Sequence, residues 1–390
     1  MECAPCHITA TAIDIDVTDD CNLRCVYCFK GPKSPRYIDN KTARRAVDWI
    51  IHASRDYPDI SVNFMGGEPL LAWNLIKELV LWGRNRAKSY GKNIRFSMTT
   101  NLTLMNDEIR AFVDQYGFGV LMSIDGCPEL HDKQRIAQHP DHRYKTVEYW
   151  ARSLLRTRPR SDARMTLIPR NVSLLAKSFQ YLTEEIGFQS VVLSAADYPD
   201  WTDELLQEYK EQMELIASML EQGYKNGKIL SLKLLTWMIK MIIHPRRQGK
   251  NITERVSPCG AGYNYQMIDF NGNIWPCHRF DFAIQIHNFD NELKMGNIFE
   301  NYYNDKLANV FLNFNFKEHQ KEECKSCPIF VQCAGGCPAC NLYYMRNIYL
   351  PHENYCRLRQ IEYKVAEKLY NKLIDDKNET FIKDLEKPFN

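Results

Sequence analysis

Three cysteines, Cys21, Cys25 and Cys28, lie within one short segment near the start of the chain. Three residues separate the first two, two residues separate the last two, and Tyr27 directly precedes the third. Three thiolates on one loop can bind three irons of a cubane iron–sulfur cluster, whereas ferredoxin patterns supply a fourth. Zinc is the alternative, but zinc sites usually pair C-x2-C units. The spacing therefore predicts a cluster with one iron open to a small molecule.

The pattern C-x3-C-x-aromatic-C resembles the signature loop of the radical SAM superfamily. The resemblance implies a [4Fe–4S] cluster that binds S-adenosylmethionine (SAM) through its amine and carboxylate, with Tyr27 among the cofactor-binding residues. It also implies reductive cleavage of SAM to a 5′-deoxyadenosyl radical. A flavodoxin- or ferredoxin-type reductant is the expected source of the electron.

A second motif, Met-Gly-Gly-Glu-Pro-Leu, occupies residues 65–70 at the end of an expected strand. Glycines let the backbone approach a ligand closely because they carry no side chain. The segment resembles the Gly-Gly-Glu motif of radical SAM enzymes, which implies that Gly66, Gly67 and Glu68 contact the ammonium group of SAM. The alternative is a plain strand-to-helix turn with a solvated glutamate.

A third motif begins with Ser-Ile-Asp-Gly at Ser123 and continues to His-Asp-x-x-Arg, which ends at Arg135. It resembles peptide-modifying radical SAM enzymes, including anaerobic sulfatase-maturating enzymes. The resemblance implies that Ser123 and Asp125 contact the SAM ribose and that Arg135 pairs with the SAM carboxylate. The alternative for His131 and Arg135 is an ion-pair network at a helix entry. Arg164, on a later strand, is expected to contact SAM or substrate because a charge inside a core needs a partner.

Eight further cysteines lie between Cys259 and Cys356, and their spacing resembles the seven-cysteine SPASM domain. The segment Asn-Gly-Asn-Ile-Trp-Pro-Cys, which ends at Cys277, has the tight turn of that family. The resemblance implies two auxiliary iron–sulfur clusters. The ligands expected for the first are Cys259, Cys277 and Cys337, and those for the second are Cys324, Cys327, Cys333 and Cys356.

The first auxiliary cluster is one ligand short, because no cysteine lies between Cys259 and Cys277, where sulfatase-maturating enzymes supply one. Cys340 is the spare cysteine in this region. Either it completes the cluster, or the cluster keeps an open iron for a substrate thiolate; the count favours Cys340 as a ligand. The sequence thus predicts three [4Fe–4S] clusters. The cysteines left without a role are Cys3, Cys6 and Cys127.

Length and composition are those of an ordinary globular protein with two or three domains: 390 residues, 45% hydrophobic and 25% charged. A net charge of +2 gives no reason to expect a nucleic-acid or membrane-surface partner. The first residues do not form a signal peptide, and the most apolar helix candidate, residues 229–244, is too short and too charged to span a bilayer. We expect a cytoplasmic protein whose cysteines are not paired in disulfides; eleven of the fourteen are expected to be metal ligands, and Cys3, Cys6 and Cys127 free thiols.

Short β-branched runs alternate with helical patterns through the first 230 residues, which predicts a parallel sheet with right-handed crossovers. The expected strands are residues 12–17, 59–65, 93–98, 119–124, 163–168 and 189–194. The fold class expected is α/β, a partial (β/α)6 TIM-type barrel followed by a small iron–sulfur SPASM domain. An open doubly wound sheet is the alternative, but no Gly-x-Gly-x-x-Gly follows a strand. The expected boundaries are 1–250 for the barrel, 251–356 for SPASM and 357–390 for a C-terminal helix and tail.

The resemblance covers residues 10–370 and implies a radical SAM/SPASM oxidoreductase that modifies a peptide or protein. The expected reaction is a cross-link, thioether or carbon–carbon, in a ribosomal precursor peptide. The alternative is oxidation of Cys or Ser to formylglycine, as in anaerobic sulfatase-maturating enzymes. Those enzymes have an aspartate base after the cysteine that matches Cys277, and this chain has His278 there. A non-catalytic electron carrier with several clusters is a remote alternative. Such a carrier would need no SAM pocket, whereas the Gly-Gly-Glu and Ser-Ile-Asp-Gly segments predict one.

Two expectations concern the substrate. His278 or Asp281 could act as the base; alternatively, both support the auxiliary cluster from its second coordination shell. Only twenty residues precede Cys21. We therefore expect a leader peptide to be recognised by another surface or by a separate leader-binding protein.

Overall fold

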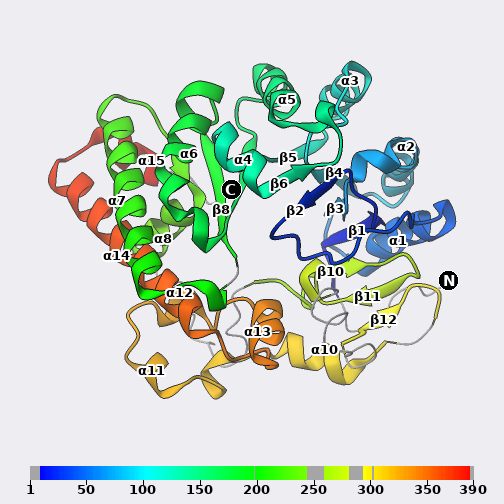
Figure 1. Ribbon diagram of the computed structural model, residues 1–390. Coiled ribbons are helices and arrows are strands. Elements are labelled where there is room, and N and C mark those ends of the chain that lie inside the picture. The colour runs from blue at the N-terminus through cyan, green and yellow to red at the C-terminus, as the bar shows by residue number, and fades with distance from the viewer. Residues whose placement is uncertain (1–8, 197, 244–258, 281–292, 301–302, 387–390) are drawn as a thin grey trace.

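The computed structural model describes residues 9–196, 198–243, 259–280, 293–300 and 303–386 (Figure 1). Its strands are β1 (Ala12–Thr18), β2 (Leu23–Cys25), β3 (Asp59–Gly66), β4 (Asn93–Thr100), β5 (Gly119–Ser123), β6 (Arg135–Ala137), β7 (Asp162–Leu167), β8 (Ser190–Ala195), β9 (Ser231–Leu232), β10 (Tyr265–Ile268), β11 (Asn273–Trp275) and β12 (Gly296–Asn297). Ten of them form one sheet in the order β12-β11-β10-β1-β3-β4-β5-β7-β8-β9, and β2 pairs with β6 in a second sheet. The six predicted strands are β1, β3, β4, β5, β7 and β8, and all are parallel to their neighbours.

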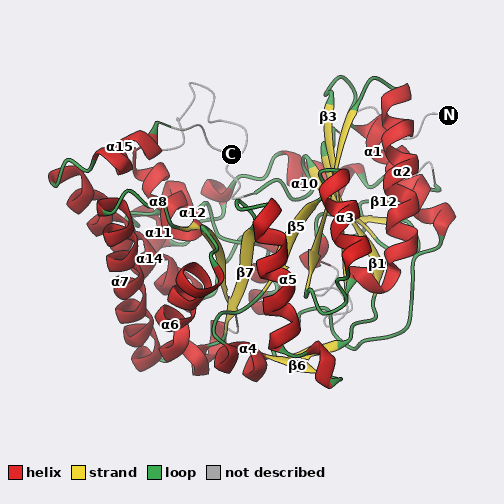
Figure 2. Cartoon of the chain, turned by 90° about the horizontal axis from the view of Figure 1, so that it is seen from above, coloured by secondary structure: helices red, strands yellow, loops and turns green. Residues whose placement is uncertain are grey.

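Helices follow most of these strands, and Figure 2 shows α1, α2, α3 and α5 along one side of the sheet. The helices of the first part are α1 (Asn40–Ala53), α2 (Trp73–Ser89), α3 (Asp107–Gln115), α4 (Pro128–Gln134), α5 (Tyr144–Thr157), α6 (Leu175–Gln180), α7 (Asp203–Lys225) and α8 (Lys233–Ile243). Those of the second part are α10 (Asp305–Leu312), α11 (Glu322–Lys325), α12 (Phe330–Cys333), α13 (Pro338–Met345), α14 (Glu353–Asp375) and α15 (Glu379–Leu385). No described helix combines the length and the apolar character that crossing a membrane requires.

Strand β1 shows why the inner face of the sheet is suited to a binding site. Ile13, Ile15 and Val17 are buried, as expected for the side of a strand that packs against helices. The residues between them, Asp14 and Asp16, are also buried although they are acidic. Because a buried carboxylate needs partners, their presence marks the inner face as polar.

The described strands of the C-terminal region belong to the same sheet as the barrel strands. β10 pairs in parallel with β1, with Ala12 opposite Tyr265, and β11 and β12 extend the same sheet in antiparallel fashion. The sheet therefore runs across the boundary predicted near residue 250, which itself lies outside the described residues. Helix α14 returns to the barrel side, where Tyr209 of α7 donates a buried 2.7 Å hydrogen bond to Glu362. Strands from the second part of the chain thus line the same interior as β1.

Candidate functional site

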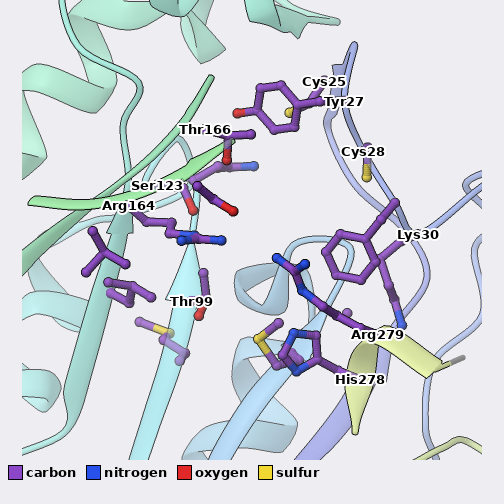
Figure 3. Close-up of a pocket in the computed structure, with 18 of the residues that line it drawn as sticks. Cys25, Tyr27, Cys28, Lys30, Thr99, Ser123, Arg164, Thr166, His278 and Arg279 are labelled. Carbon is purple, nitrogen blue, oxygen red and sulfur yellow. The ribbon is translucent and has the colours of Figure 1, made fainter. Parts of the chain in front are cut away.

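A cavity of about 1310 Å³ runs along the inner face of the sheet (Figure 3). Its walls include the cysteine loop, the carboxyl ends of β3, β4 and β5, and the face of β7. Tyr265, His278, Arg279 and Cys340 contribute the wall formed by the C-terminal region. The cavity therefore brings the predicted SAM site and part of the predicted SPASM domain together.

Short backbone ladders fix the cysteine loop. β2 and β6 pair antiparallel, which places Cys25 opposite Arg135. The amide of Val26 donates to the carbonyl of Gln134 at 2.8 Å. The amide of Cys28 donates to the carbonyl of Cys25 at 3.1 Å, so the last two cysteines share one turn.

Gly66 and Gly67 allow β3 to end against the cysteine loop. A Cβ atom added to Gly66 would lie 2.2 Å from the carbonyl oxygen of Thr18, and one added to Gly67 would lie 1.9 Å from that of Asp20. Gly66 also has φ of +131°, which favours glycine. The amide of Gly67 donates to Thr18 at 2.6 Å, and that of Glu68 to Asp20 at 2.8 Å. The two glycines hence join the strand end to the loop; whether they also contact SAM stays a prediction.

The Glu68 carboxylate is buried and organises the next strand end. It accepts hydrogen bonds from the Thr100 hydroxyl at 2.6 Å, the Asn101 amide at 2.8 Å and the Leu70 amide at 3.1 Å. Burial raises the pKa of Glu68 to about 6. Asn101 in turn donates to Asn22 of the cysteine loop at 2.9 Å. Glu68 is therefore no solvated turn residue, and it lines the cavity beside Cys21.

Asp125 ties the cysteine loop to the barrel. Its Oδ2 accepts from the Tyr27 hydroxyl at 2.6 Å and from Gln134 at 3.0 Å. Its Oδ1 accepts from Arg135 at 2.9 Å and from the Thr166 amide at 3.0 Å. Nearby Arg135 and its hydrogen bonds hold the pKa of Asp125 below the usual value despite burial. The network includes the ion pair considered for Arg135, while the ribose contact of Asp125 stays a prediction.

The donor set at the loop fits an iron–sulfur cluster and SAM. Burial raises the pKa of Cys21 to about 12 and that of Cys25 to about 11, so both thiols would keep their protons unless a metal replaced them. The Nε of Arg135 is buried, and none of the residues that the structure describes is hydrogen-bonded to it. An added carboxylate would satisfy this group.

His278 belongs to a polar chain that crosses the floor of the cavity. Its Nδ1 lies 2.6 Å from Asp14 Oδ2 and 2.7 Å from the Tyr265 hydroxyl, which also donates to Asp14. Asn63 donates to the other oxygen of Asp14 at 2.9 Å and accepts from Ser97 at 3.0 Å. Burial and the Asp14 carboxylate raise the pKa of Tyr265. With Nδ1 engaged, Nε2 is the nitrogen of His278 left for a substrate.

The auxiliary cysteines have one another as electrostatic neighbours. Cys277 is close enough to Cys337 and Cys259 for their charges to influence it. Cys324, Cys327, Cys333 and Cys356 influence one another in the same way. The described cysteines are all free thiols. Their ligand roles stay predictions, and their grouping is consistent with two clusters.

Cys340 lies between the first auxiliary set and the cavity. It is hydrogen-bonded to Cys337, and its Sγ accepts from Arg279 Nη1 at 3.1 Å. Cys127 is buried beside Ser178 and lies outside the site. Cys3, Cys6 and Asp281 are outside the described residues. Cys340 is thus placed either to complete the first cluster or to face a substrate.

Asp14, Asn63, Tyr265 and Arg279 line the cavity although the sequence analysis gave them no role. One signal was available for Asp14, because acidic residues alternate with apolar ones along β1. Tyr265 and Arg279 had no comparable signal, since their position depends on the pairing of β10 with β1.

Comparisons with known proteins agree with the two predicted parts. A family model for the radical SAM superfamily matches residues 15–181, and one for an iron–sulfur cluster-binding domain, SPASM, matches residues 259–328. The chain is 23% identical over 341 residues to a cysteine-type anaerobic sulfatase-maturating enzyme of Clostridium perfringens, covering 82% of this chain and 86% of that enzyme. It is 36% identical over 118 residues to an uncharacterized protein of Methanocaldococcus jannaschii, but this match covers only 39% of that relative.

Solved structures of other proteins resemble most of the chain. The structure of native anSMEcpe with bound AdoMet gives a TM-score of 0.75 at 20% identity and covers 94% of this chain and 99% of its own. Streptococcus suis SuiB bound to the precursor peptide SuiA gives 0.60 at 16% identity, with coverage of 89% and 76%. At these identities the likeness shows a shared fold, and it confirms the predicted fold class.

Proposed function

Because this chain is a radical SAM enzyme with a SPASM domain, we propose that it modifies a peptide, forming a thioether or carbon–carbon cross-link in a ribosomal precursor. The observation that carries the proposal is the cavity that lies between the cysteine loop and the wall that holds His278 and Cys340. A side chain placed there would face the predicted SAM site on one side and a base on the other. The SuiB structure, with its precursor peptide, gives an example of a relative in fold that binds such a substrate.

We assign SAM and three [4Fe–4S] clusters as cofactors. Cys21, Cys25 and Cys28 would hold the first cluster, and the free acceptor position on Glu68 together with Arg135 Nε suits an amine and a carboxylate. The two C-terminal cysteine sets would hold the others. When bound, these groups supply a carbon radical that removes a hydrogen atom from the substrate, and an acceptor for the electron that bond closure releases.

We assign His278 as the group that accepts the substrate proton. A carboxylate on Nδ1 fixes the ring and leaves Nε2 as an acceptor, which is the arrangement found in many general bases. Asp14 holds that ring in place and, together with Tyr265, keeps it against the cavity wall. In a cross-link the proton would come from the thiol or from the carbon that joins the radical.

Formylglycine formation is the second candidate, favoured by the similarity to a cysteine-type sulfatase-maturating enzyme over 82% of this chain. The two reactions leave different products. A cross-link removes two hydrogen atoms from the peptide and keeps the sulfur. Formylglycine formation from cysteine replaces the CH2–SH group by an aldehyde.

The test uses reconstituted holoenzyme with SAM and either dithionite or a flavodoxin as reductant. It is first assayed for 5′-deoxyadenosine, and Cys25→Ala serves as the matched control without the first cluster. Short peptides encoded beside the gene are then added, with and without any neighbouring leader-binding protein, and their masses measured. Loss of two hydrogens supports the proposal, and an aldehyde supports the second candidate. Absence of 5′-deoxyadenosine from the wild type would refute both.

His278→Gln tests the base separately. Because general bases typically contribute about a hundredfold or more, product formation should fall at least that far while 5′-deoxyadenosine release continues. Equal loss of both activities would instead indicate a structural role for His278.

A further inference from the structure

Two arginines face the cavity from opposite walls. Arg164 projects from β7, and Arg279 lies two residues after Cys277 on the wall formed by the C-terminal region. Figure 3 shows both guanidinium groups pointing into the same space, with Thr99 and Ser123 nearby. The two charges are close enough that Arg279 acts on Arg164, and burial together with this neighbour lowers the pKa of Arg164 to about 10.

Arg164 has no hydrogen-bonded anion among the described residues, and the acceptor of Arg279 is a thiol. Among the described residues, no group accepts a hydrogen bond from the guanidinium of Arg164, and no carboxylate forms an ion pair with it. Arg279 donates to Cys340 and lies 6.0 Å from the Phe29 ring centroid, so a sulfur is its hydrogen-bond acceptor. Two adjacent buried cations are unfavourable unless an anion lies between them. The arrangement is therefore suited to a ligand that brings a negative charge.

The depth of Arg164 argues against the carboxylate of SAM as that anion. Arg164 precedes Thr166 by two residues, which places it about 7 Å farther from the cysteine loop along the strand. The SAM carboxylate is expected at the open iron, next to the loop, where Arg135 has its unpartnered Nε. Arg279 instead directly follows the proposed base and donates to Cys340, where a substrate would be, and Arg164 faces the same space.

We propose that Arg164 and Arg279 together bind a carboxylate of the substrate peptide, so that this enzyme prefers an acidic residue next to the modified position. The proposal rests on the proposed function, since it assumes that a peptide enters this cavity. A guanidinium binds a carboxylate through two parallel hydrogen bonds, and here it would do so in a site shielded from water. The carboxylate would anchor the peptide backbone and thereby fix which side chain reaches the cysteine loop.

The test measures binding to SAM-saturated holoenzyme by isothermal titration. The probes are the acetylated and amidated peptides Gly-Gly-Glu-Gly-Gly and Gly-Gly-Gln-Gly-Gly, together with the Gln peptide carrying a free carboxyl terminus. The wild type should bind the Glu peptide about tenfold to a hundredfold more tightly than the amidated Gln peptide. Tight binding of only the peptide with the free terminus would contradict the proposal of an internal acidic residue.

Arg164→Gln should bring the two affinities within about twofold of each other, while Arg164→Lys should keep part of the preference because it keeps the charge. Arg160→Gln is the matched control, since Arg160 is an exposed arginine at the edge of the same cavity and its loss should leave the preference unchanged. Equal binding of both peptides by the wild type, or an unchanged preference in Arg164→Gln, would refute the proposal. If Arg164→Gln fails to fold, Arg164→Lys takes its place. A preference for the Glu peptide in Arg164→Lys as large as that of the wild type would then refute the proposal.

SAM affinity is measured in the same variants. A tenfold loss of SAM affinity in Arg164→Gln with an unchanged peptide preference would assign Arg164 to SAM and overturn the proposal. The binding assay needs no SAM cleavage. A missing preference therefore refutes the carboxylate site alone, whereas missing 5′-deoxyadenosine refutes the proposed function and leaves any carboxylate preference standing.

Discussion

Replacing Tyr27 by Phe removes one oxygen atom and tests how the cysteine loop is held. The Tyr27 hydroxyl donates a 2.6 Å hydrogen bond to Asp125, which is fully buried. A hydrogen bond to a charged group contributes about 1.5–3 kcal/mol. If that energy serves to hold the loop in its binding geometry, Tyr27→Phe should weaken SAM binding about ten- to a hundredfold.

The partner variant is Asp125→Asn, in which an NH2 group replaces one carboxylate oxygen. That group must face either Arg135 or the pair formed by Tyr27 and Gln134, all of which are donors. We expect a larger loss than for Tyr27→Phe, since breaking a buried ion pair typically costs about 3–5 kcal/mol. Part of this energetic cost will lower the stability of the folded protein and the retention of the cluster instead of SAM affinity.

The two variants combined form a double-mutant cycle. SAM affinity is measured by equilibrium dialysis on protein of matched iron content. If both residues act through one hydrogen bond, adding Tyr27→Phe to a protein that already carries Asp125→Asn should lower SAM affinity only slightly further. The coupling free energy between the two substitutions should then be about 1 kcal/mol or more. Fully additive losses, or unchanged SAM affinity in Tyr27→Phe, would refute the view that this bond positions the loop.

Two further predictions concern Cys340 and Glu68. Cys340→Ala should make the first auxiliary cluster labile if Cys340 is a ligand; unchanged electron paramagnetic resonance spectra and full turnover would remove it from the ligand set. Glu68 has a folded pKa of about 6 against an ordinary 4.5, so its contribution to stability is full below 4.5 and is lost as the pH rises through 6. The unfolding free energy of wild-type apoprotein relative to Glu68→Gln should therefore fall by about 2 kcal/mol across that range in urea titrations, and a pH-independent difference would contradict the raised pKa.

The six barrel strands could be predicted because each is a run of β-branched and apolar residues long enough to cross a sheet. β2 and β6 were missed because they have three residues each and exist only where the cysteine loop meets Arg135. β10 was missed as part of the barrel for a related reason. Its pairing with β1 joins residues about 250 positions apart, and no local pattern encodes such a contact.

The residues of the site also divide into those that a local sequence pattern predicts and those that only the folded chain brings together. The spacing of Cys21, Cys25 and Cys28 is a local property that can be recognised in the sequence, and in the structure Cys25 and Cys28 share one turn; the three ligand sets stay predictions. The interaction of His278 with Asp14 joins residues 264 positions apart, and Arg279 reaches Arg164 only across the folded cavity. Residues that act on a substrate from both walls are therefore those that the sequence conceals most.

The hydrogen-bond capacity of the motif residues separates those that can still bind a ligand from those that cannot without rearrangement. A carboxylate has about four acceptor positions, and Asp125 uses four, so a ribose hydroxyl would have to displace Tyr27, Gln134, Arg135 or the Thr166 amide. Glu68 uses three, which leaves one position on Oε2 for an ammonium group. Ser123 lines the cavity, and no described residue is hydrogen-bonded to its hydroxyl. Of the two predicted ribose contacts, that of Ser123 would need no rearrangement, whereas that of Asp125 would have to displace an existing hydrogen bond; both contacts stay predictions.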